Sequence, residues 1–304
     1  METIYNLLEN LHQQNNKFKF TFYEIYKGIY LVFMTISDSE ITFHHQRQTN
    51  MISIEYCYNG RMGWSTQNGN SVYLGPGDYV LHALDNCTDS KFTFPNNYYN
   101  GLSIYIDFNI FEPSSLSFLN ENLINFNDIY LHFFNHNHFA SFMGNEETES
   151  IFKYFYNQPQ NIQPVYWKIK TIELFLYLEK IDYTPENHLT EYRSEQIKII
   201  RSIHDDLLTH LNQRLTIDSL AKKYLINPTT LKSIFKDVYG EPIATHIKKH
   251  RINLAMKLLR ETDKTIAEIA KESGYESQSK FAKTFKNYTQ FSPSEYRNHN
   301  YNKN

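Results

Sequence analysis

Two short segments near the C-terminus intersperse polar side chains with apolar ones at helical spacing. Apolar residues such as Leu231 and Phe281 must face a core, so the polar residues between them must face away from it. These outward positions are Thr229, Thr230, Lys232, Ser233 and Lys236 in the first segment, and Gln278, Ser279, Lys280 and Lys283 in the second. Glutamine can pair with adenine, lysine with guanine or phosphate, and serine or threonine with either. Such a surface could recognise nucleic acid.

The first segment belongs to a predicted pair of short helices. Thr216 can cap one helix, in which Leu220 and Ala221 face inward. After a tight break, Asn227 is a suitable cap for the next helix, and Pro228 occupies the first helical position, where proline is favoured. Two short helices joined in this way form a helix-turn-helix unit, whose second helix enters the major groove of DNA.

A second pair of short helices follows about 49 residues later. Thr265 and Glu268 form a capping box, Gly274 ends the first helix, and Ser277 can cap the second. One such pattern is weak evidence, because many small helical domains mimic it. Two in register within a basic segment strongly indicate a pair of helix-turn-helix units.

A longer helix is predicted between the two pairs, from Pro242 to about Arg260. Its roughly 18 residues would span about 27 Å at 1.5 Å per residue. This length is close to the roughly 34 Å repeat of duplex DNA. The helix could therefore hold two reading helices in successive segments of the major groove.

The charge of the chain is divided unequally along its length. Residues 193–304 contain 20 lysine and arginine residues against 12 acidic ones, a net charge of +8, whereas residues 1–192 carry 10 against 21, a net charge of -11. This asymmetry favours a nucleic-acid-binding module joined to a module with another role.

Residues 195–297 resemble the DNA-binding domain of the AraC/XylS family of transcription regulators. The resemblance is carried by Ile266, Ile269, Ala270, Gly274, Tyr275, Ser277, Phe281, Phe285, Lys286, Ser292, Pro293, Tyr296 and Arg297. It covers about a third of the chain, and the signature is specific. Gln290 stands where the family usually has glycine, and a side chain there is expected to strain a left-handed turn by about 1 kcal/mol.

The resemblance implies that the polar residues described above contact DNA. It assigns base edges to Thr229, Lys232, Ser233, Gln278, Ser279 and Lys283. Thr230 and Lys236 would lie nearer the phosphates, with Lys280 close to the second set. The implied function is a sequence-specific regulator of transcription, without enzymatic activity, that binds operator or promoter DNA.

The resemblance also implies partners and a regulatory mode. The N-terminal domain of such regulators binds a small-molecule effector, and the response changes recruitment of RNA polymerase. Activation is favoured over repression by the resemblance alone. A homodimer located in the cytoplasm is expected.

The fold class predicted is α+β with two domains. Residues 1–183 would form an effector-sensing and dimerisation domain, 184–192 a linker, and 193–300 the DNA-binding domain. Strand-like runs over about 18–110 indicate a small antiparallel barrel or sandwich, and the resemblance implies a cupin-like barrel. The pairs Asn59-Gly60 and Asn68-Gly69 predict hairpin turns.

Residues of about 146–182 are predicted to be helical. The stretch 165–181 is apolar on more than one face, so it needs more cover than one sheet provides. A helix from a second subunit and burial within the monomer remain equal alternatives.

Candidate effector-binding residues are aromatic. Tyr56, Tyr58, Trp64 and Tyr79 could line a pocket, although in a chain with 24 tyrosines such residues more often belong to an ordinary core.

A metal-dependent cupin-type enzyme or sensor, fused to a helical interaction module, is the alternative function. His44 and His45 are adjacent, and His132, His136 and His138 are clustered, but three or more ligands would have to converge. The expected cupin pattern of His-x-His with a following glutamate is missing from the barrel region. We therefore predict no metal and no other cofactor.

Cys57 and Cys87 are too few for a disulfide framework, and a redox sensor is disfavoured because neither has a basic or histidine neighbour in sequence. No apolar run approaches the roughly 18 residues of a membrane span, and no glycine-rich phosphate loop or nucleophile elbow is present.

Overall fold

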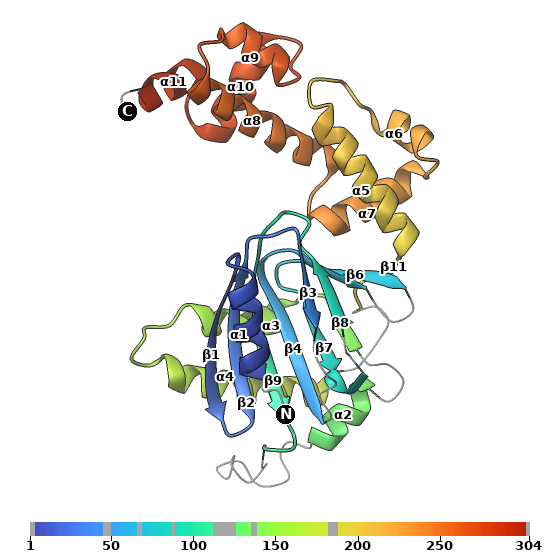
Figure 1. The fold of residues 1–304 in the computed structure, drawn as a ribbon, viewed down its shortest axis with the longest axis vertical. Helices are drawn as coiled ribbons and strands as arrows, with labels where there is room; N and C mark the ends of the chain where they lie inside the picture. Colours follow the sequence, from blue (N-terminus) through green and yellow to red (C-terminus); the bar gives the residue numbers. More distant parts are fainter. Residues whose placement is uncertain are drawn as a thin grey trace. The chain divides into compact units, whose positions relative to one another are not determined.

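The computed structural model describes residues 4–44, 50–65, 69–86, 89–111, 126–134, 139–181 and 188–301. The chain divides into two compact units, Met1–Tyr192 and Arg193–Asn304 (Figure 1). The first unit combines sheets with helices and the second is helical, which confirms the mixed α and β class. No helix among the described residues is both long and apolar enough to cross a bilayer.

The N-terminal unit contains two largely antiparallel sheets. The hydrogen-bonded order of the first is β1 (Phe18–Tyr26), β2 (Ile29–Ile36), β9 (Tyr99–Asp107), β4 (Met51–Gly60), β7 (Tyr79–Ala83) and β10 (Phe139–Phe142). The order of the second is β11 (Tyr192–Arg193), β6 (Asn70–Leu74), β5 (Met62–Ser65), β8 (Asp89–Thr93) and β3 (Glu40–His44).

Strand β4 lies inside the six-stranded sheet, between β9 and β7, and apolar side chains on both of its faces are buried. Ile52, Ile54 and Tyr56 belong to the apolar cluster shared with the helices. Met51 and Cys57, which alternate with them, belong to the cluster shared with the second sheet. A strand buried on both sides usually reads as a continuous apolar run, and here Ser53 and Glu55 interrupt that run on the side of the second sheet.

The described strands form two open sheets instead of the expected cupin-like barrel. The first sheet ends at β1 and β10, and the second ends at β11 and β3. Val32 and Val80 of the first sheet share a core with Trp64 and Leu74 of the second. The sheets thus meet through packed side chains, because their apolar faces are buried against each other, and helix α1 (Ile4–Gln14) adds its apolar face to the same core.

The hairpin predicted at Asn59-Gly60 is wrong. Strand β4 pairs with β7 and β9, whereas β5 pairs with β6 and β8, so this dipeptide carries the chain from one sheet to the other. Gly60 has a φ of +85°, and a Cβ there would lie 2.3 Å from the carbonyl oxygen of Tyr98. Glycine is therefore the residue that fits the backbone at this crossover. Asn68 lies outside the described residues, and the strands flanking Asn68-Gly69, β5 and β6, do pair antiparallel.

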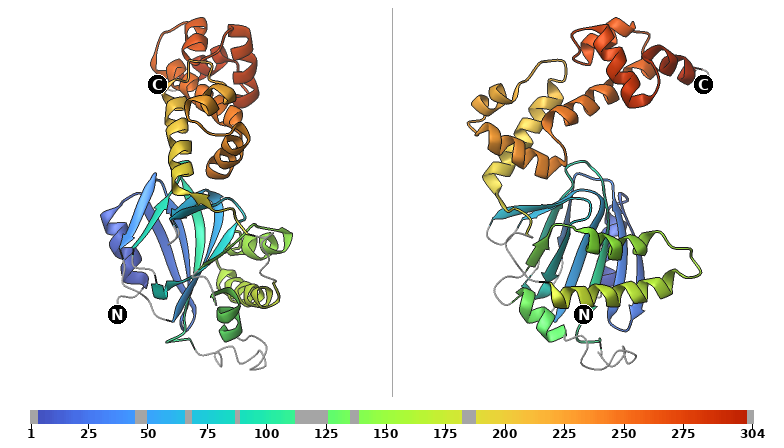
Figure 2. Two further views of the ribbon diagram at one scale, coloured as in Figure 1. Left: turned by 90° about the vertical axis from the view of Figure 1, so that its right-hand side faces the viewer. Right: turned by 180° about the vertical axis from the view of Figure 1, so that it is seen from behind.

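Helices of the N-terminal unit cover the face of the six-stranded sheet that the second sheet leaves free. They are α2 (Phe126–Phe134), α3 (Glu146–Tyr156) and α4 (Gln163–Lys180), with a short 3₁₀ turn η1 (Leu84–Asn86) after β7. Figure 2 shows α3 and α4 along this face. Asn145 and Thr148 form a capping box that begins α3, and the indole nitrogen of Trp167 on α4 donates to the carbonyl of Phe155 on α3 at 2.9 Å.

Helix α4 is buried within the monomer on one side only. Trp167, Phe175 and Leu178 are buried in the core shared with the sheet. Val165 and Ile169 expose 60% and 54% of their surface, and Leu176 exposes 37%. Part of the apolar surface noted in the sequence therefore has no cover within the described chain.

The C-terminal unit contains seven described helices. They are α5 (Ser194–Thr209), α6 (Ile217–Lys223), α7 (Pro228–Tyr239), α8 (Ile243–Glu261), α9 (Ile266–Glu272), α10 (Gln278–Thr289) and α11 (Pro293–Tyr301). Helix α8 is the predicted long helix and joins the pair α6–α7 to the pair α9–α10 (Figure 1). Ile252, Ala255 and Leu259 of α8 form one core with Phe281 and Phe285 of α10.

Candidate nucleic-acid interface

The first helix pair is built on two caps that the sequence predicts. The hydroxyl of Thr216 accepts from the backbone N–H of Ser219 at 3.1 Å, and the Ser219 hydroxyl oxygen accepts from the N–H of Thr216 at 3.0 Å. The side-chain oxygen of Asn227 accepts from the N–H groups of Thr229 and Thr230 at 2.8 and 3.4 Å. These bonds satisfy N–H groups that the start of a helix leaves free, so α6 and α7 begin where the sequence predicts.

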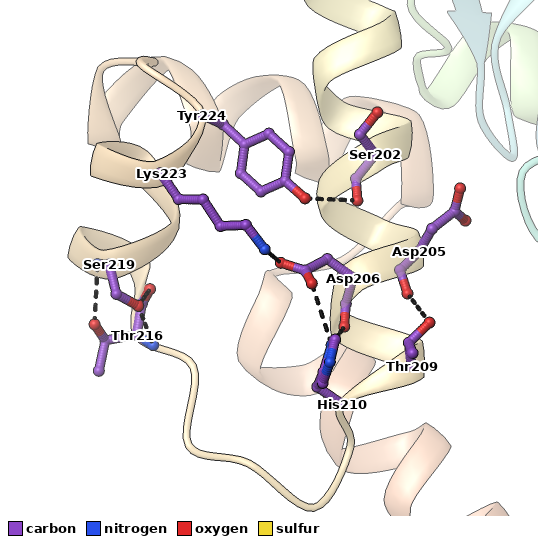
Figure 3. Close-up of polar contacts among 9 residues, drawn as sticks. All are labelled: Ser202, Asp205, Asp206, Thr209, His210, Thr216, Ser219, Lys223 and Tyr224. Carbon is purple, nitrogen blue, oxygen red and sulfur yellow. Dashed lines mark hydrogen bonds and ion pairs between the residues drawn. The ribbon is translucent and has the colours of Figure 1, made fainter.

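Polar contacts fix α6 against α5 (Figure 3). Lys223 Nζ lies 2.6 Å from Asp206 Oδ2, and the hydroxyl of Tyr224 donates to the carbonyl of Ser202 at 3.2 Å. His210 Nδ1 lies 3.1 Å from the other oxygen of Asp206. The hydrogen bond from Lys223 lowers the pKa of the Asp206 carboxyl, so this residue is ionised at neutral pH.

The second helix pair repeats the arrangement with different capping residues. Thr265 and Glu268 form the predicted capping box, in which the Thr265 oxygen accepts from the N–H of Glu268 at 3.2 Å. Ser277 accepts from the N–H of Lys280 at 3.3 Å and so caps α10. Gly274, in the turn between the helices, has a φ of +78°.

The predicted residues of α7 form one exposed stripe. Thr229, Lys232, Ser233 and Lys236 are exposed and follow the spacing i, i+3, i+4 and i+7. Thr230 is half-buried. The opposite side of the helix is buried through Leu231, Ile234, Phe235 and Val238. The sequence prediction that these polar side chains face away from the core is thus met in the structure.

The predicted residues of α10 are also exposed. Gln278, Ser279, Lys280 and Lys283 all lie on the surface, and Phe281 and Phe285 are fully buried. Lys286 is exposed as well, although it was not among the residues predicted to contact DNA. Helices α7 and α10 match at an offset of 50 residues, which pairs Lys286 with Lys236, and this offset was the signal that could have found it.

Four lysines of the two stripes have free charges. Among the residues that the structure describes, no carboxylate lies within ion-pairing distance of Lys232, Lys236, Lys280 or Lys283. By contrast, Lys223, Lys249 and Lys264 elsewhere in the unit pair with Asp206, Glu241 and Glu272. The unpaired ammonium groups can bind an anionic partner without first breaking an internal ion pair.

Helix α8 separates the two pairs. Its 19 residues span about 28 Å at 1.5 Å per residue. The guanidinium of Arg251, near its middle, donates from Nε to the carbonyl of Leu211 at 2.8 Å and from a terminal nitrogen to that of Gln213 at 2.9 Å. These bonds hold the segment after α5 against α8.

The four aromatic residues considered for an effector site do not converge. Tyr56 stacks on Phe152 of α3 with ring centroids 4.1 Å apart, and Tyr79 belongs to the same helix-covered core. Tyr58 is exposed and stacks on Tyr156. Trp64 lies in the other core, between the two sheets.

The residues of the alternative metal and thiol sites are only partly described. His45, His136, His138 and Cys87, and the side chain of His44, lie outside the described residues, and His132 is exposed on α2. Cys57 is buried, and burial raises the pKa of its thiol, which disfavours the reactive thiolate.

Comparison with known proteins places the similarity in the C-terminal unit. Residues 220–299 match a family model described as a helix-turn-helix domain. The regulatory protein SoxS of Escherichia coli is 34% identical over 100 residues, which make up 33% of this chain and 94% of SoxS. The uncharacterized HTH-type transcriptional regulator YtdP of Bacillus subtilis is 30% identical over 107 residues, but this chain covers only 13% of that longer protein.

One solved structure is similar over about a third of the chain. The C-terminal domain of AraT, a response regulator from Geobacillus stearothermophilus, is 31% identical over 33% of this chain and 84% of that chain, with a TM-score of 0.33.

Proposed function

The chain belongs to the AraC/XylS family of DNA-binding transcription regulators, and we propose that α7 and α10 are its two reading helices. The observation that carries this proposal is that the same kind of helix occurs twice in the C-terminal unit. Each of these helices begins at a side-chain cap, buries phenylalanine side chains, and exposes a polar stripe with unpaired lysines. A helix of this kind fits the major groove of duplex DNA.

The proposed contacts divide into base and phosphate contacts. Base edges are read by Thr229, Lys232, Ser233, Gln278, Ser279 and Lys283. Phosphates are bound by Lys236 and Lys280, with Thr230 beside them, and Lys286 joins this group as the counterpart of Lys236. Phosphate contacts position the protein on the duplex, and base contacts give specificity.

DNA footprinting tests the proposal. The full chain is titrated onto the intergenic DNA beside its own gene, and a footprint covering sites in neighbouring major-groove segments is expected. The double variant Lys232→Ala with Lys283→Ala should lose this footprint. A matched control is Lys198→Ala, because Lys198 is an exposed lysine of α5 outside both stripes.

Two outcomes would contradict the assignment. One is a wild-type chain that binds all duplexes equally at every salt concentration, since sequence-specific sites must outcompete nonspecific DNA. The other is a control variant that loses as much affinity as the double variant.

The N-terminal unit is proposed to sense a small-molecule effector, as an open counterpart of the cupin-like barrel. The space between its sheets supports this role because polar groups lie there among apolar ones. Ser103 donates to the Glu55 carboxylate, and His82, whose ring lies 5.4 Å from that of Trp64, has a buried Nε2 without a hydrogen-bond partner among the described residues. A polar ligand could satisfy these groups. Of the four aromatic candidates, Trp64 is the one placed beside them.

Activation through RNA polymerase and assembly as a homodimer complete the proposal. The exposed apolar stripe of α4, which includes Val165 and Ile169, is the surface proposed to meet the same stripe of a second copy. Sedimentation of the full chain and of Ile169→Glu tests the dimer, and transcription in vitro with purified RNA polymerase tests activation. A wild-type chain that sediments as a monomer would contradict the first, and an unchanged transcript level would contradict the second.

A further inference from the structure

Three histidines meet between α5 and α8, next to helix α7. His204 comes from α5, and His246 and His250 come from α8. The Nε2 atom of His246 lies 3.0 Å from Nε2 of His204 and 3.1 Å from Nε2 of His250. One nitrogen from each ring lies within 4.8 Å of the others.

The two separations that involve His246, 3.0 and 3.1 Å, are close to those around a tetrahedral zinc ion. With zinc–nitrogen bonds of about 2.0–2.1 Å, neighbouring ligand nitrogens are about 3.3 Å apart. His246 and His250 have the i, i+4 spacing that places two imidazoles on one face of a helix, as in helical zinc sites. His204, on the neighbouring helix, supplies the third nitrogen.

Carboxylates at the far side of two rings orient the nitrogens inward. Glu241 Oε1 lies 3.2 Å from Nδ1 of His246, and Asp205 Oδ1 lies 3.5 Å from Nδ1 of His204. A carboxylate at Nδ1 holds the proton there and leaves the Nε2 lone pair free, which is the arrangement found behind metal-bound histidines. Unprotonated Nε2 atoms in mutual contact repel one another unless a proton or a cation lies between them.

Burial and aromatic packing hold the three rings in place. His246 is buried, and the ring of Tyr239 stacks on that of His204 with centroids 4.2 Å apart. Phe235, also on α7, packs edge-on against His246 at 5.4 Å. Burial lowers the pKa of all three imidazoles, so they are neutral ligands at neutral pH.

We propose that His204, His246 and His250 bind one divalent transition-metal ion, with zinc as the expected ion and water in the fourth position. The ion would join α5 to α8 directly behind the reading helix α7, and so fix the first helix pair to the connecting helix. The site lies apart from the exposed stripes of α7 and α10. Its metal binding can therefore be tested without DNA.

The test uses the full chain, purified without a histidine tag and treated with a chelator. Addition of Co²⁺ should give the visible absorption bands of a tetrahedral complex, saturating at one equivalent, and Zn²⁺ should displace them. Zn²⁺ should also raise the melting temperature. A wild-type chain with no tetrahedral spectrum and no thermal shift would overturn the proposal, whatever the variants do.

Variants assign the ligands. His250→Asn should abolish the saturable cobalt spectrum. Glu241→Gln, which removes the carboxylate behind His246 and its ion pair with Lys249, should weaken the affinity about 10- to 100-fold. His210→Asn is the matched control, because His210 lies just after α5 and contacts Asp206 instead. Equal loss in the control, or an undiminished spectrum in a folded His250→Asn, would overturn the assignment.

Discussion

Leu225 and Gly274 occupy the same position in the two helix-turn-helix turns, and both have positive φ, at +52° and +78°. At Gly274 a Cβ would lie 2.2 Å from the carbonyl oxygen of Leu211, so this turn accepts only glycine. At Leu225 the side chain is 93% exposed and meets no such obstacle. The first turn thus bears the strain of a left-handed residue, and the second avoids it.

The substitution Leu225→Gly is expected to stabilise the C-terminal unit by about 1 kcal/mol. It removes the left-handed strain, offset in part by the greater flexibility of glycine in the unfolded chain, and no buried contact is lost. Urea denaturation of the full chain, followed by circular dichroism, measures the change. Gly274→Ala should act in the opposite sense by about 2 kcal/mol or more. A less stable Leu225→Gly would contradict the strain argument.

Gln290→Gly is expected to stabilise the same unit by a similar amount, about 1 kcal/mol. Gln290 ends α10 with a φ of +66°, where Gly240 ends α7 with a φ of +83°. This confirms the left-handed turn that the sequence predicts at the family's usual glycine. Within the described part of the chain, the Gln290 side chain forms one long hydrogen bond, 3.4 Å to the carbonyl of Asn287, so little is lost with it. A higher denaturation midpoint at unchanged slope is the expected readout, and an unchanged or lower midpoint would refute it.

The helical unit was more predictable than the sheets because its signals are local. Asn227 with Pro228, and Thr265 with Glu268, determine helix starts within a few residues of chain. Gly60, by contrast, looks like part of a hairpin turn, but the partners of β4 and β5 lie far away in sequence, so a local pattern could not show the crossover.

The sequence also could not predict which side chains far apart along the chain lie together in the fold. His246 and His250 stand at a ligand spacing that could have been noticed, yet His204 joins them only because α5 packs against α8. For the same reason Trp64 could not be separated from Tyr56 and Tyr79, since the side of a sheet that each occupies depends on strand register.

Glu55 should make the stability of the N-terminal unit depend on pH. Burial raises the pKa of its carboxyl from 4.5 to about 7, against the opposing effect of hydrogen bonds from Ser103 and Ser53. The folded chain therefore holds a proton that the unfolded chain releases between these values. The stabilising contribution of Glu55 is therefore fully present below pH 4.5 and is lost as the pH rises through 7.

The substitution Glu55→Gln should abolish this loss. Because Glu55 keeps some contact with solvent, we expect a gain on the order of 2 kcal/mol at pH 8 relative to the wild type. Denaturation at pH 5 and pH 8 measures it, and Glu179→Gln, an exposed position on α4, is the control. Parallel pH profiles for wild type and Glu55→Gln would show that the carboxyl is already ionised in the folded state.

Replacing Lys283 and replacing Lys236 should change DNA binding in different ways, and the salt dependence of the affinity distinguishes them. Lys283→Ala should lower the affinity for the specific site by about 1–3 kcal/mol and relax specificity at one base pair, because a base contact is removed. Lys236→Ala should weaken binding to all sequences alike and reduce the salt dependence by about one released counterion. Fluorescence anisotropy with specific and scrambled duplexes at several salt concentrations separates the two effects. If Lys283→Ala weakened both duplexes equally, Lys283 would be a phosphate contact, and base reading by α10 would depend on Gln278 and Ser279.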